Sequence, residues 1–259
     1  MSEGGIIGVL SQRINAGECV FTAWIGINDP AIPEQLAREG YDAVMLDMQH
    51  GAIDLAGAMR GVGAAALAGK PAIVRIPVGD FATASRVIDA GAAAVIAPMI
   101  NSGADAKRFV DFMKYPPVGQ RSWGPRAALA MSGLVGPAYL HSANAITLAI
   151  AMIETREALD ALDNILATPG IDGVFVGPSD LSIALNHGAV VDPHGADVDA
   201  QLSHVAARAK AHGKFASMFC FDGKQARAMA QRGYRLVSVA TDQLLLRMAA
   251  RTELAIARG

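Results

Sequence analysis

The sequence has few cysteines, little excess charge and no long apolar run, and each absence excludes a class of protein. Two cysteines, Cys19 and Cys220, are too few for a disulfide framework, so a reduced cytosolic setting is the simplest interpretation. The formal net charge is -2, and no excess of positive charge would attract nucleic acid or anionic lipid. The N-terminus lacks a run of signal-peptide length, and no stretch approaches the roughly 20 apolar residues that span a membrane. We therefore expect a cytoplasmic protein that binds neither nucleic acid nor membrane.

Short apolar runs alternate with helical patterns along nearly all of the 259 residues. Four of the runs are entered by similar phrases, "REGYDAVML", "DAGAAAVIA", "TPGIDGVFV" and "QRGYRLVSV", each with a glycine where a helix must end in a left-handed residue. The predicted strands are Val20–Ile25, Ala43–Leu46, Ala72–Arg75, Ala93–Ala97, Leu148–Ile153, Gly173–Val176, Phe215–Phe219 and Leu236–Val239. A repeated helix–glycine–strand unit predicts parallel strands joined by right-handed crossovers.

Eight such strands in this length favour a single-domain (β/α)8 TIM barrel over residues 1–259. The alternative is a doubly wound open sheet, but the chain has neither the G-x-G-x-x-G signature after its first strand nor a P-loop. No linker rich in proline, serine or charge divides the chain. The longest stretch predicted to be irregular covers residues 115–137, where the length of the connection suggests a binding loop.

Polar residues follow four of the predicted strands at their carboxyl ends, which in a barrel share one face. Asp47, Gln49 and His50 follow the second strand, Arg75 ends the third, and Glu154 follows the fifth. The sixth is followed by "GPSDLS", which contains Gly177, Ser179 and Asp180. We therefore expect two acids, a guanidinium and an imidazole to converge.

This combination of side chains suits metal-assisted chemistry on a 2-oxo acid. Glu154 and Asp180 offer the hard oxygen ligands that Mg²⁺ or Mn²⁺ prefer, and such an ion can polarise a 2-oxo group. Arg75 could stabilise the enolate that develops, and His50 is suited to proton transfer near neutral pH. "GPSDLS" could open a helix whose free N–H groups accept a carboxylate. Because no lysine stands at a strand end, a Schiff-base mechanism has no candidate.

Each residue also has a purely structural alternative. His50 could be a structural histidine, and Arg75 could simply pair with Asp47 or Asp80. Glu154 and Asp180 could be acids that stabilise the first turns of the helices that follow them. The joint placement of all four at one face favours the functional interpretation.

The phrases "LDMQHG", "VRIPVGD", "MIETREAL" and "GVFVGPSDLS", with "KYPPVGQRSWGP", resemble the HpcH/HpaI family of metal-dependent class II pyruvate aldolases from about residue 20 to 245. The resemblance implies a hexameric barrel protein whose last helix is exchanged between subunits. It also implies that Glu154 and Asp180 bind Mg²⁺, Mn²⁺ or Co²⁺ and that Arg75 holds the keto oxygen.

The resemblance further assigns residues to proton transfer and to substrate binding. It implies that His50 is the acid/base, that Asp47 and Asp89 are active-site acids, and that Asp89 pairs with the histidine of the same or of a neighbouring subunit. The N–H groups of Ser179 and Asp180, beside Gly177, would bind the carboxylate of the substrate.

Two residues depart from the family pattern, and both bear on specificity. Gln49 stands where many members have glutamate, and Met152 where many have glutamine, so the aldehyde preference is left open. Gln49 could supply a hydrogen bond to the substrate, and Trp123 could line the entrance, although a packed Trp123 fits the sequence equally well.

The leading hypothesis is therefore reversible aldol cleavage of a 4-hydroxy-2-oxo acid to an aldehyde and pyruvate, or a close analogue such as hydroxypyruvate. An acyl-CoA lyase like the citrate lyase β subunit is the alternative enzyme, although no basic cluster for CoA is evident. A barrel that has lost its activity is the non-enzyme alternative.

Overall fold

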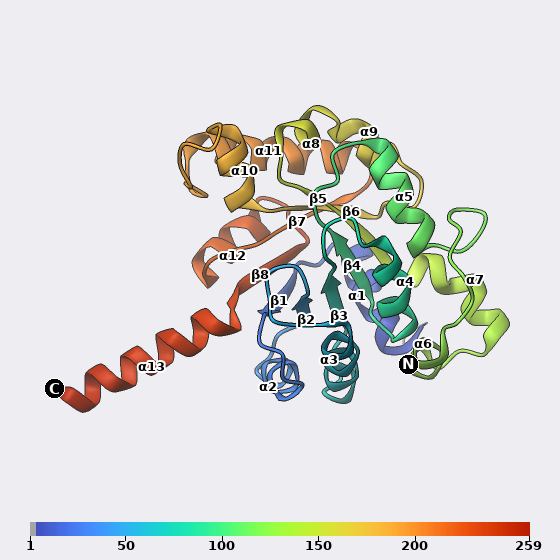
Figure 1. The fold of residues 1–259 in the computed structure, drawn as a ribbon, viewed down its shortest axis with the longest axis horizontal. Coiled ribbons are helices and arrows are strands. Elements are labelled where there is room, and N and C mark those ends of the chain that lie inside the picture. Colours follow the sequence, from blue (N-terminus) through green and yellow to red (C-terminus); the bar gives the residue numbers. More distant parts are fainter. Residues whose placement is uncertain (1–3) are drawn as a thin grey trace.

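The computed structural model describes residues 4–259 and contains a closed barrel of eight parallel strands in chain order, β1 to β8 (Figure 1). The strands are β1 Val20–Ile25, β2 Ala43–Asp47, β3 Ala72–Arg75, β4 Ala94–Ala97, β5 Leu148–Ile153, β6 Gly173–Val176, β7 Phe215–Met218 and β8 Leu236–Thr241. This confirms the (β/α)8 prediction and excludes the open sheet, because β1 pairs with both β2 and β8.

Helices connect the strands and surround the barrel. They are α1 Gly5–Asn15, α2 Ala31–Arg38, α3 Leu55–Leu67, α4 Phe81–Asp89, α5 Gly103–Met113, α6 Arg126–Ser132, α7 Gly136–Ile146, α8 Arg156–Asp160, α9 Leu162–Ala167, α10 Pro178–Leu185, α11 Ala196–Ala211, α12 Gly223–Gln231 and α13 Asp242–Arg258. The prediction that residues 115–137 are wholly irregular was wrong, since α6 lies within them and α7 begins there. The run of apolar residues that forms α6 is too short for its periodicity to distinguish a two-turn helix from a loop.

The four glycines singled out in the sequence all adopt the left-handed conformation. Gly40, Gly91, Gly170 and Gly233 have φ of 93°, 104°, 93° and 97° and lie between a helix and the strand that follows it. A residue with a Cβ is strained in this region, so glycine fixes where each crossover ends.

Alternation along the strands divides the core into two layers. In β2, Met45 packs with a cluster that also contains Ile73, Met152 and Phe175, whereas Val44 belongs to a second cluster shared with the surrounding helices. The first cluster fills the barrel, because side chains two residues apart in a strand share a face. Asp47, Arg75 and Glu154 each stand two residues after an inward member of that cluster. Their side chains therefore continue the inward face at the carboxyl end.

A buried ion pair lies at the opposite end of the barrel. Lys114 follows α5, and its Nζ donates to the carbonyl oxygens of Asn144 at 2.8 Å and Thr147 at 2.5 Å. The same Nζ donates to Asp172 Oδ2 at 2.7 Å. Thr147 and Asp172 directly precede β5 and β6, so this lysine ties the amino ends of two strands to α5 and α7.

The last helix, α13, extends away from the barrel at the carboxyl terminus of the chain (Figure 1). Its buried residue is Asp242, at its first position, and its apolar side chains Leu246, Met248, Leu254 and Ile256 are exposed. Across residues 4–259, every helix is too short or too polar to cross a bilayer.

Candidate active site

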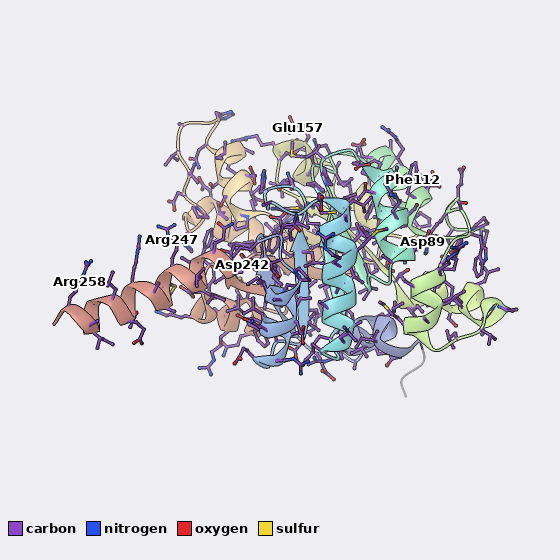
Figure 2. The ribbon with its side chains drawn as sticks, turned by 60° about the horizontal axis from the view of Figure 1, so that its bottom comes forward. Asp89, Phe112, Glu157, Asp242, Arg247 and Arg258 are labelled. Atoms are coloured by element: carbon purple, nitrogen blue, oxygen red, sulfur yellow. The ribbon has the colours of Figure 1, made fainter. Side chains whose placement is uncertain are left out.

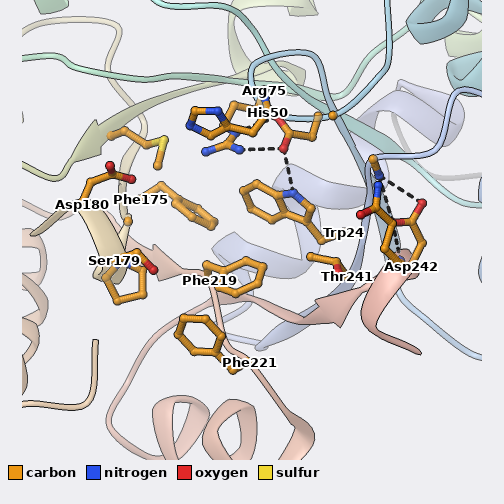
Figure 3. A pocket seen from close by; sticks show the side chains of 17 residues that line it. Trp24, His50, Arg75, Phe175, Ser179, Asp180, Phe219, Phe221, Thr241 and Asp242 are labelled. Carbon is orange, nitrogen blue, oxygen red and sulfur yellow. Dashed lines mark hydrogen bonds and ion pairs between the residues drawn. The ribbon is translucent and has the colours of Figure 1, made fainter. Parts of the chain in front are cut away.

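A cavity of about 340 Å³ opens at the carboxyl end of the barrel (Figure 3). Every strand except β4 contributes a lining residue from its end or from the loop that follows. The lining residues are Trp24, Gly26, Asp47, His50, Gly51, Arg75, Met152, Phe175, Gly177, Pro178, Ser179, Asp180, Phe219, Phe221, Thr241, Asp242 and Gln243. Three of the four predicted polar groups, those of His50, Arg75 and Asp180, therefore face one cavity, whereas the fourth, Glu154, is not among its lining residues.

Asp47 accepts hydrogen bonds from several neighbouring groups at the edge of the cavity near β2 and β3. Arg75 donates to it through two nitrogens, Nε to Oδ1 at 2.9 Å and Nη2 to Oδ2 at 2.6 Å. The indole Nε1 of Trp24 donates to Oδ2 at 3.1 Å. The backbone N–H groups of Gln49 and His50 donate to Oδ1 at 3.0 and 3.2 Å. Burial alone would raise the pKa of Asp47, but the hydrogen bonds and charge of Arg75 outweigh it, and the pKa is lowered. Asp47 is thus held as a carboxylate.

Arg75 is buried, and its orientation is fixed from two sides. Asp47 holds the guanidinium by a two-point hydrogen bond, and the Trp24 ring lies 4.7 Å from Arg75 Cζ. Arg75 Nη1 and the second hydrogen of Arg75 Nη2 make no hydrogen bond with Asp47. The guanidinium therefore keeps donors for a ligand in the cavity that it lines.

Glu154 directly follows β5, is not among the residues that line the cavity, and is only 2% exposed. Its Oε1 accepts the N–H of Met99 at 2.9 Å, and Met99, just after β4, has a φ of 55° that is uncommon for a residue with a Cβ. A Cβ at Gly177 would lie 2.6 Å from Glu154 Oε2, so the glycine lets the backbone after β6 approach this carboxylate. Burial raises the pKa of Glu154, the Met99 N–H opposes the shift, and the negative charge of Asp180 adds to it.

Asp180 lies in the first turn of α10, whose N-terminus opens into the cavity. The Leu181 N–H bonds to the carbonyl of Gly177, and Pro178 has no N–H, so the helix's free donors are those of Ser179 and Asp180. This is the arrangement that binds anions at helix ends.

His50 and Gln49 lie at the rim of this site. His50 is exposed, and its ring lies beside Arg75 in Figure 3. The Gln49 amide oxygen is buried and has no hydrogen-bond partner within residues 4–259. Gln49 is outside the cavity lining, so its predicted contact with the substrate stays a prediction.

The chemistry of the donors fits a divalent ion bound by two carboxylates. Within residues 4–259, no group of three His, Cys, Asp or Glu side chains is placed to hold a metal. Glu154 and Asp180 nevertheless interact electrostatically and repel, a repulsion that a cation between them would relieve. Mg²⁺ is commonly bound by one or two carboxylates, with substrate and water as its other ligands.

Two predicted site residues, Asp89 and Trp123, are not among the residues that line the cavity. Asp89 ends α4 and forms an ion pair of 2.5 Å with the fully buried side chain of Arg121. Figure 2 shows it on a different part of the molecule from Asp242, which lines the cavity. Trp123 packs near Tyr115 and Tyr139, with ring centroids 5.6 and 6.2 Å away. Neither residue lines the cavity, and their predicted contacts with the substrate or with His50 stay predictions.

The sequence prediction missed lining residues from three other strands. Trp24 lies near the end of β1, and Phe219 and Phe221 follow β7. Thr241 is the last residue of β8, and Asp242 follows it. Applying the strand-end rule to apolar as well as ionisable residues would have found the first three. The last two were missed because β8 was predicted to end two residues early.

Comparison with known proteins agrees with this architecture. A profile of the family described as HpcH/HpaI aldolase/citrate lyase matches residues 21–249. A hydroxypyruvate/pyruvate aldolase of Rhizorhabdus wittichii is 41% identical over 95% of this chain and 96% of its own length. A 4-hydroxy-2-oxo-heptane-1,7-dioate aldolase of Klebsiella pneumoniae is 30% identical over 91% of this chain and 88% of its own. The crystal structure of an HpcH/HpaI aldolase/citrate lyase family protein from Burkholderia cenocepacia, 32% identical, superposes with a TM-score of 0.87 over 97% of this chain and 100% of that one.

Proposed function

Because the chain belongs to the HpcH/HpaI aldolase/citrate lyase family, we propose that it cleaves a 4-hydroxy-2-oxo acid reversibly, with a divalent metal ion, to an aldehyde and pyruvate or hydroxypyruvate. The enzyme is a carbon–carbon lyase, and aldol cleavage of the pyruvate aldolase type is its reaction class. Members of the family are generally dependent on divalent metals.

The two ends of the 2-oxo acid find complementary groups in the cavity. Its carboxylate would accept hydrogen bonds from the free N–H groups of Ser179 and Asp180 at the start of α10. Its 2-oxo oxygen would accept a hydrogen bond from the guanidinium of Arg75, which Asp47 holds in place. Because these donors are already oriented, they stabilise negative charge that develops on the oxygen without reorganising.

Glu154 and Asp180 would hold the divalent ion, Mg²⁺, Mn²⁺ or Co²⁺. When bound, such an ion acts as a Lewis acid toward the 2-oxo group.

His50 is the proposed base for the bond-breaking step. It would remove the proton from the C4 hydroxyl, C4 would become the carbonyl carbon of the aldehyde, and the electron pair of the C3–C4 bond would remain on the 2-oxo acid as an enolate. Protonation of C3 then completes the 2-oxo acid product. The exposed position of His50 allows proton exchange with water.

The observation that carries the proposal is the arrangement of Arg75. A buried guanidinium is fixed by a carboxylate and an indole, yet retains donors that face the same cavity as the free N–H groups of α10.

The test is a cleavage screen with several 4-hydroxy-2-oxo acids in the presence of each metal, detecting the released 2-oxo acid. We expect Glu154→Gln to abolish metal-dependent turnover, because a neutral amide is a poor ligand for these ions. Glu157→Gln, an exposed position three residues further on, is the matched control and should retain activity.

The same screen tests the proposed base. We expect His50→Ala to lower turnover by about 10²- to 10⁴-fold while metal affinity, measured by calorimetry, stays nearly unchanged. His204→Ala, at an exposed position of α11, is the control. Equal turnover of His50→Ala and wild type would refute the assigned base.

Acyl-CoA cleavage is the weaker alternative. A CoA thioester carries several phosphate charges, whereas the fixed cation among the described residues that line the cavity is Arg75, which already pairs with Asp47. Turnover of a CoA thioester, in preference to the 4-hydroxy-2-oxo acids, would favour this alternative.

The projecting helix α13 supports a further part of the proposal, that the enzyme is a homo-oligomer, with the hexamer as the expected form. Leu246, Met248, Leu254 and Ile256 are between 49% and 69% exposed, which is costly for a helix in water. A second copy of the chain would cover them, and light scattering would give the mass. The enzyme is proposed to act in the cytoplasm.

A further inference from the structure

One side of the cavity is built from aromatic rings rather than polar groups. This aromatic wall consists of Trp24, Phe175, Phe219 and Phe221. Phe219 stands edge-on to Trp24, with centroids 5.1 Å apart, and to Phe221, at 5.0 Å. Phe175 lies 5.6 Å from Trp24 on the other side. In Figure 3 the wall runs below Arg75 and His50 and continues to Phe221, away from the polar edge.

The wall continues from the place where the 2-oxo acid would be held. In Figure 3, Phe175 lies beside Asp180 and Trp24 lies below Arg75, and Phe219 and Phe221 follow further from Arg75. A substrate whose carboxylate lies at Ser179 and whose oxo group lies at Arg75 would have its C4 substituent left to occupy the remaining space. That space is bounded by Phe219 and Phe221.

The charges that line the cavity disfavour a second anion. Asp47, Asp180 and Asp242 are carboxylates, and the fixed cation among the described lining residues is Arg75. Arg75 is already paired and is needed for the 2-oxo group. Beyond the lining residues, the exposed ring of His194 lies 5.3 Å from Phe221. A second carboxylate or a phosphate on the aldehyde would therefore lose hydration without gaining a fixed counter-ion.

We infer that the aldehyde portion of the substrate is apolar and ring-bearing, and that the aromatic wall binds it. The inference rests on the proposed aldol cleavage and names the substrate class for it. A phenyl substituent at C4 would stack or pack edge-on against Phe219 and Phe221, as these rings already do with one another.

The test compares two substrates with the same 4-hydroxy-2-oxo acid and different C4 substituents. One carries a phenyl group, so that cleavage releases benzaldehyde, and the other carries a carboxyethyl group, so that cleavage releases succinic semialdehyde. We expect kcat/KM to be at least about tenfold higher for the phenyl substrate, the range that an apolar pocket provides. Equal values, or a preference for the carboxyethyl substrate, would overturn the inference.

A pair of variants identifies the wall as the cause. Phe221→Arg introduces a cation at the outer ring and should lower the ratio of the two kcat/KM values by about tenfold or more, whereas Phe221→Leu keeps an apolar side chain and should lower it less. Because each ratio is measured on one protein preparation, loss of folded enzyme cancels. A ratio that Phe221→Arg leaves unchanged would remove Phe221 from the binding wall and overturn the assignment.

A separate assay distinguishes failure of this inference from failure of the proposed function. Exchange of the C3 hydrogens of pyruvate with deuterium from the solvent requires the enolate but no aldehyde, and it is followed by NMR with a divalent ion present. Exchange by the wild-type enzyme without a phenyl preference would leave the proposed function standing and remove the inference. Absence of exchange, and of cleavage of either substrate, would remove both.

Discussion

Two buried cations lie at opposite ends of the same barrel, and they differ in how their donors are used. Lys114, at the amino end, donates through Nζ to two carbonyl oxygens and to Asp172, which accounts for all three of its hydrogens. Arg75, at the carboxyl end, directs two nitrogens to Asp47 and retains further donors beside a cavity. Both are ion pairs, but only the second has capacity left for a ligand.

The difference gives a criterion for distinguishing a buried charged residue that serves only the fold from one that can also contact a ligand. Breaking either pair leaves a carboxylate without its partner, and this is costly in both cases. A lysine that the protein fully satisfies can affect only the fold, whereas an arginine with unused donors can affect a substrate. The following experiments should separate the two effects.

The largest expected effect is on turnover, from a substitution that preserves charge at the carboxyl end. Arg75→Lys keeps the cation but loses the planar two-point contact with Asp47, so it should lower kcat/KM by about 10²- to 10³-fold. Arg86→Lys, at an exposed position of α4, is the control and should have little effect. Steady-state assays of both variants decide the point, and an active Arg75→Lys would contradict the assigned contact with the 2-oxo group.

The next effect is on stability, from the amino end. Lys114→Met removes the donor shared by Asp172 and two carbonyl groups, and the free energy of unfolding should fall by about 3 kcal/mol. Denaturant titration at one fixed protein concentration measures this loss. The kinetic constants of the protein that remains folded should match those of wild type. Lys107→Met, at an exposed position of α5, is the control. A loss of substrate affinity in Lys114→Met would contradict a purely structural role for the lysine at the amino end.

The smallest effect concerns pH. The pKa of Asp47 is lowered below its ordinary value of 3.8, so its ion pair stabilises the folded protein above about pH 4, and this contribution is lost as the pH falls through the lowered value. Asp47→Asn should be less stable than wild type by about 2 kcal/mol at pH 7, and the gap should narrow in stronger acid. Unfolding curves at pH 7 and pH 3 measure it, with exposed Asp160→Asn as the control. A gap of the same size at both pH values would contradict the pairing.

The barrel was predictable because local signals repeat. Each strand was recognised by its apolar run, and glycines such as Gly40 and Gly91 marked the crossovers, since only glycine adopts their φ without strain. Strand ends then predicted that Asp47, Arg75 and Asp180 would meet, because parallel strands of a barrel end on one face.

The remainder depends on contacts that have no local signal. The Met99 N–H reaches Glu154 because a methionine adopts a left-handed conformation, and nothing in its neighbourhood in the sequence announces this. Trp24 pairs with Asp47 across two strands, which requires their register. The predicted pairing of Asp89 with a histidine stays a prediction, because within the chain Asp89 pairs with Arg121.

The first residue of α13 has a mechanical consequence. Asp242 accepts the N–H groups of Gly26 and Ile27, at 3.1 and 2.9 Å, and so fastens the base of the helix to the loop after β1, at the rim of the cavity. The helix has 17 residues and reaches about 25 Å from this anchor. Contacts along the exposed length of α13 are therefore joined through one continuous helix to a carboxylate that lines the cavity.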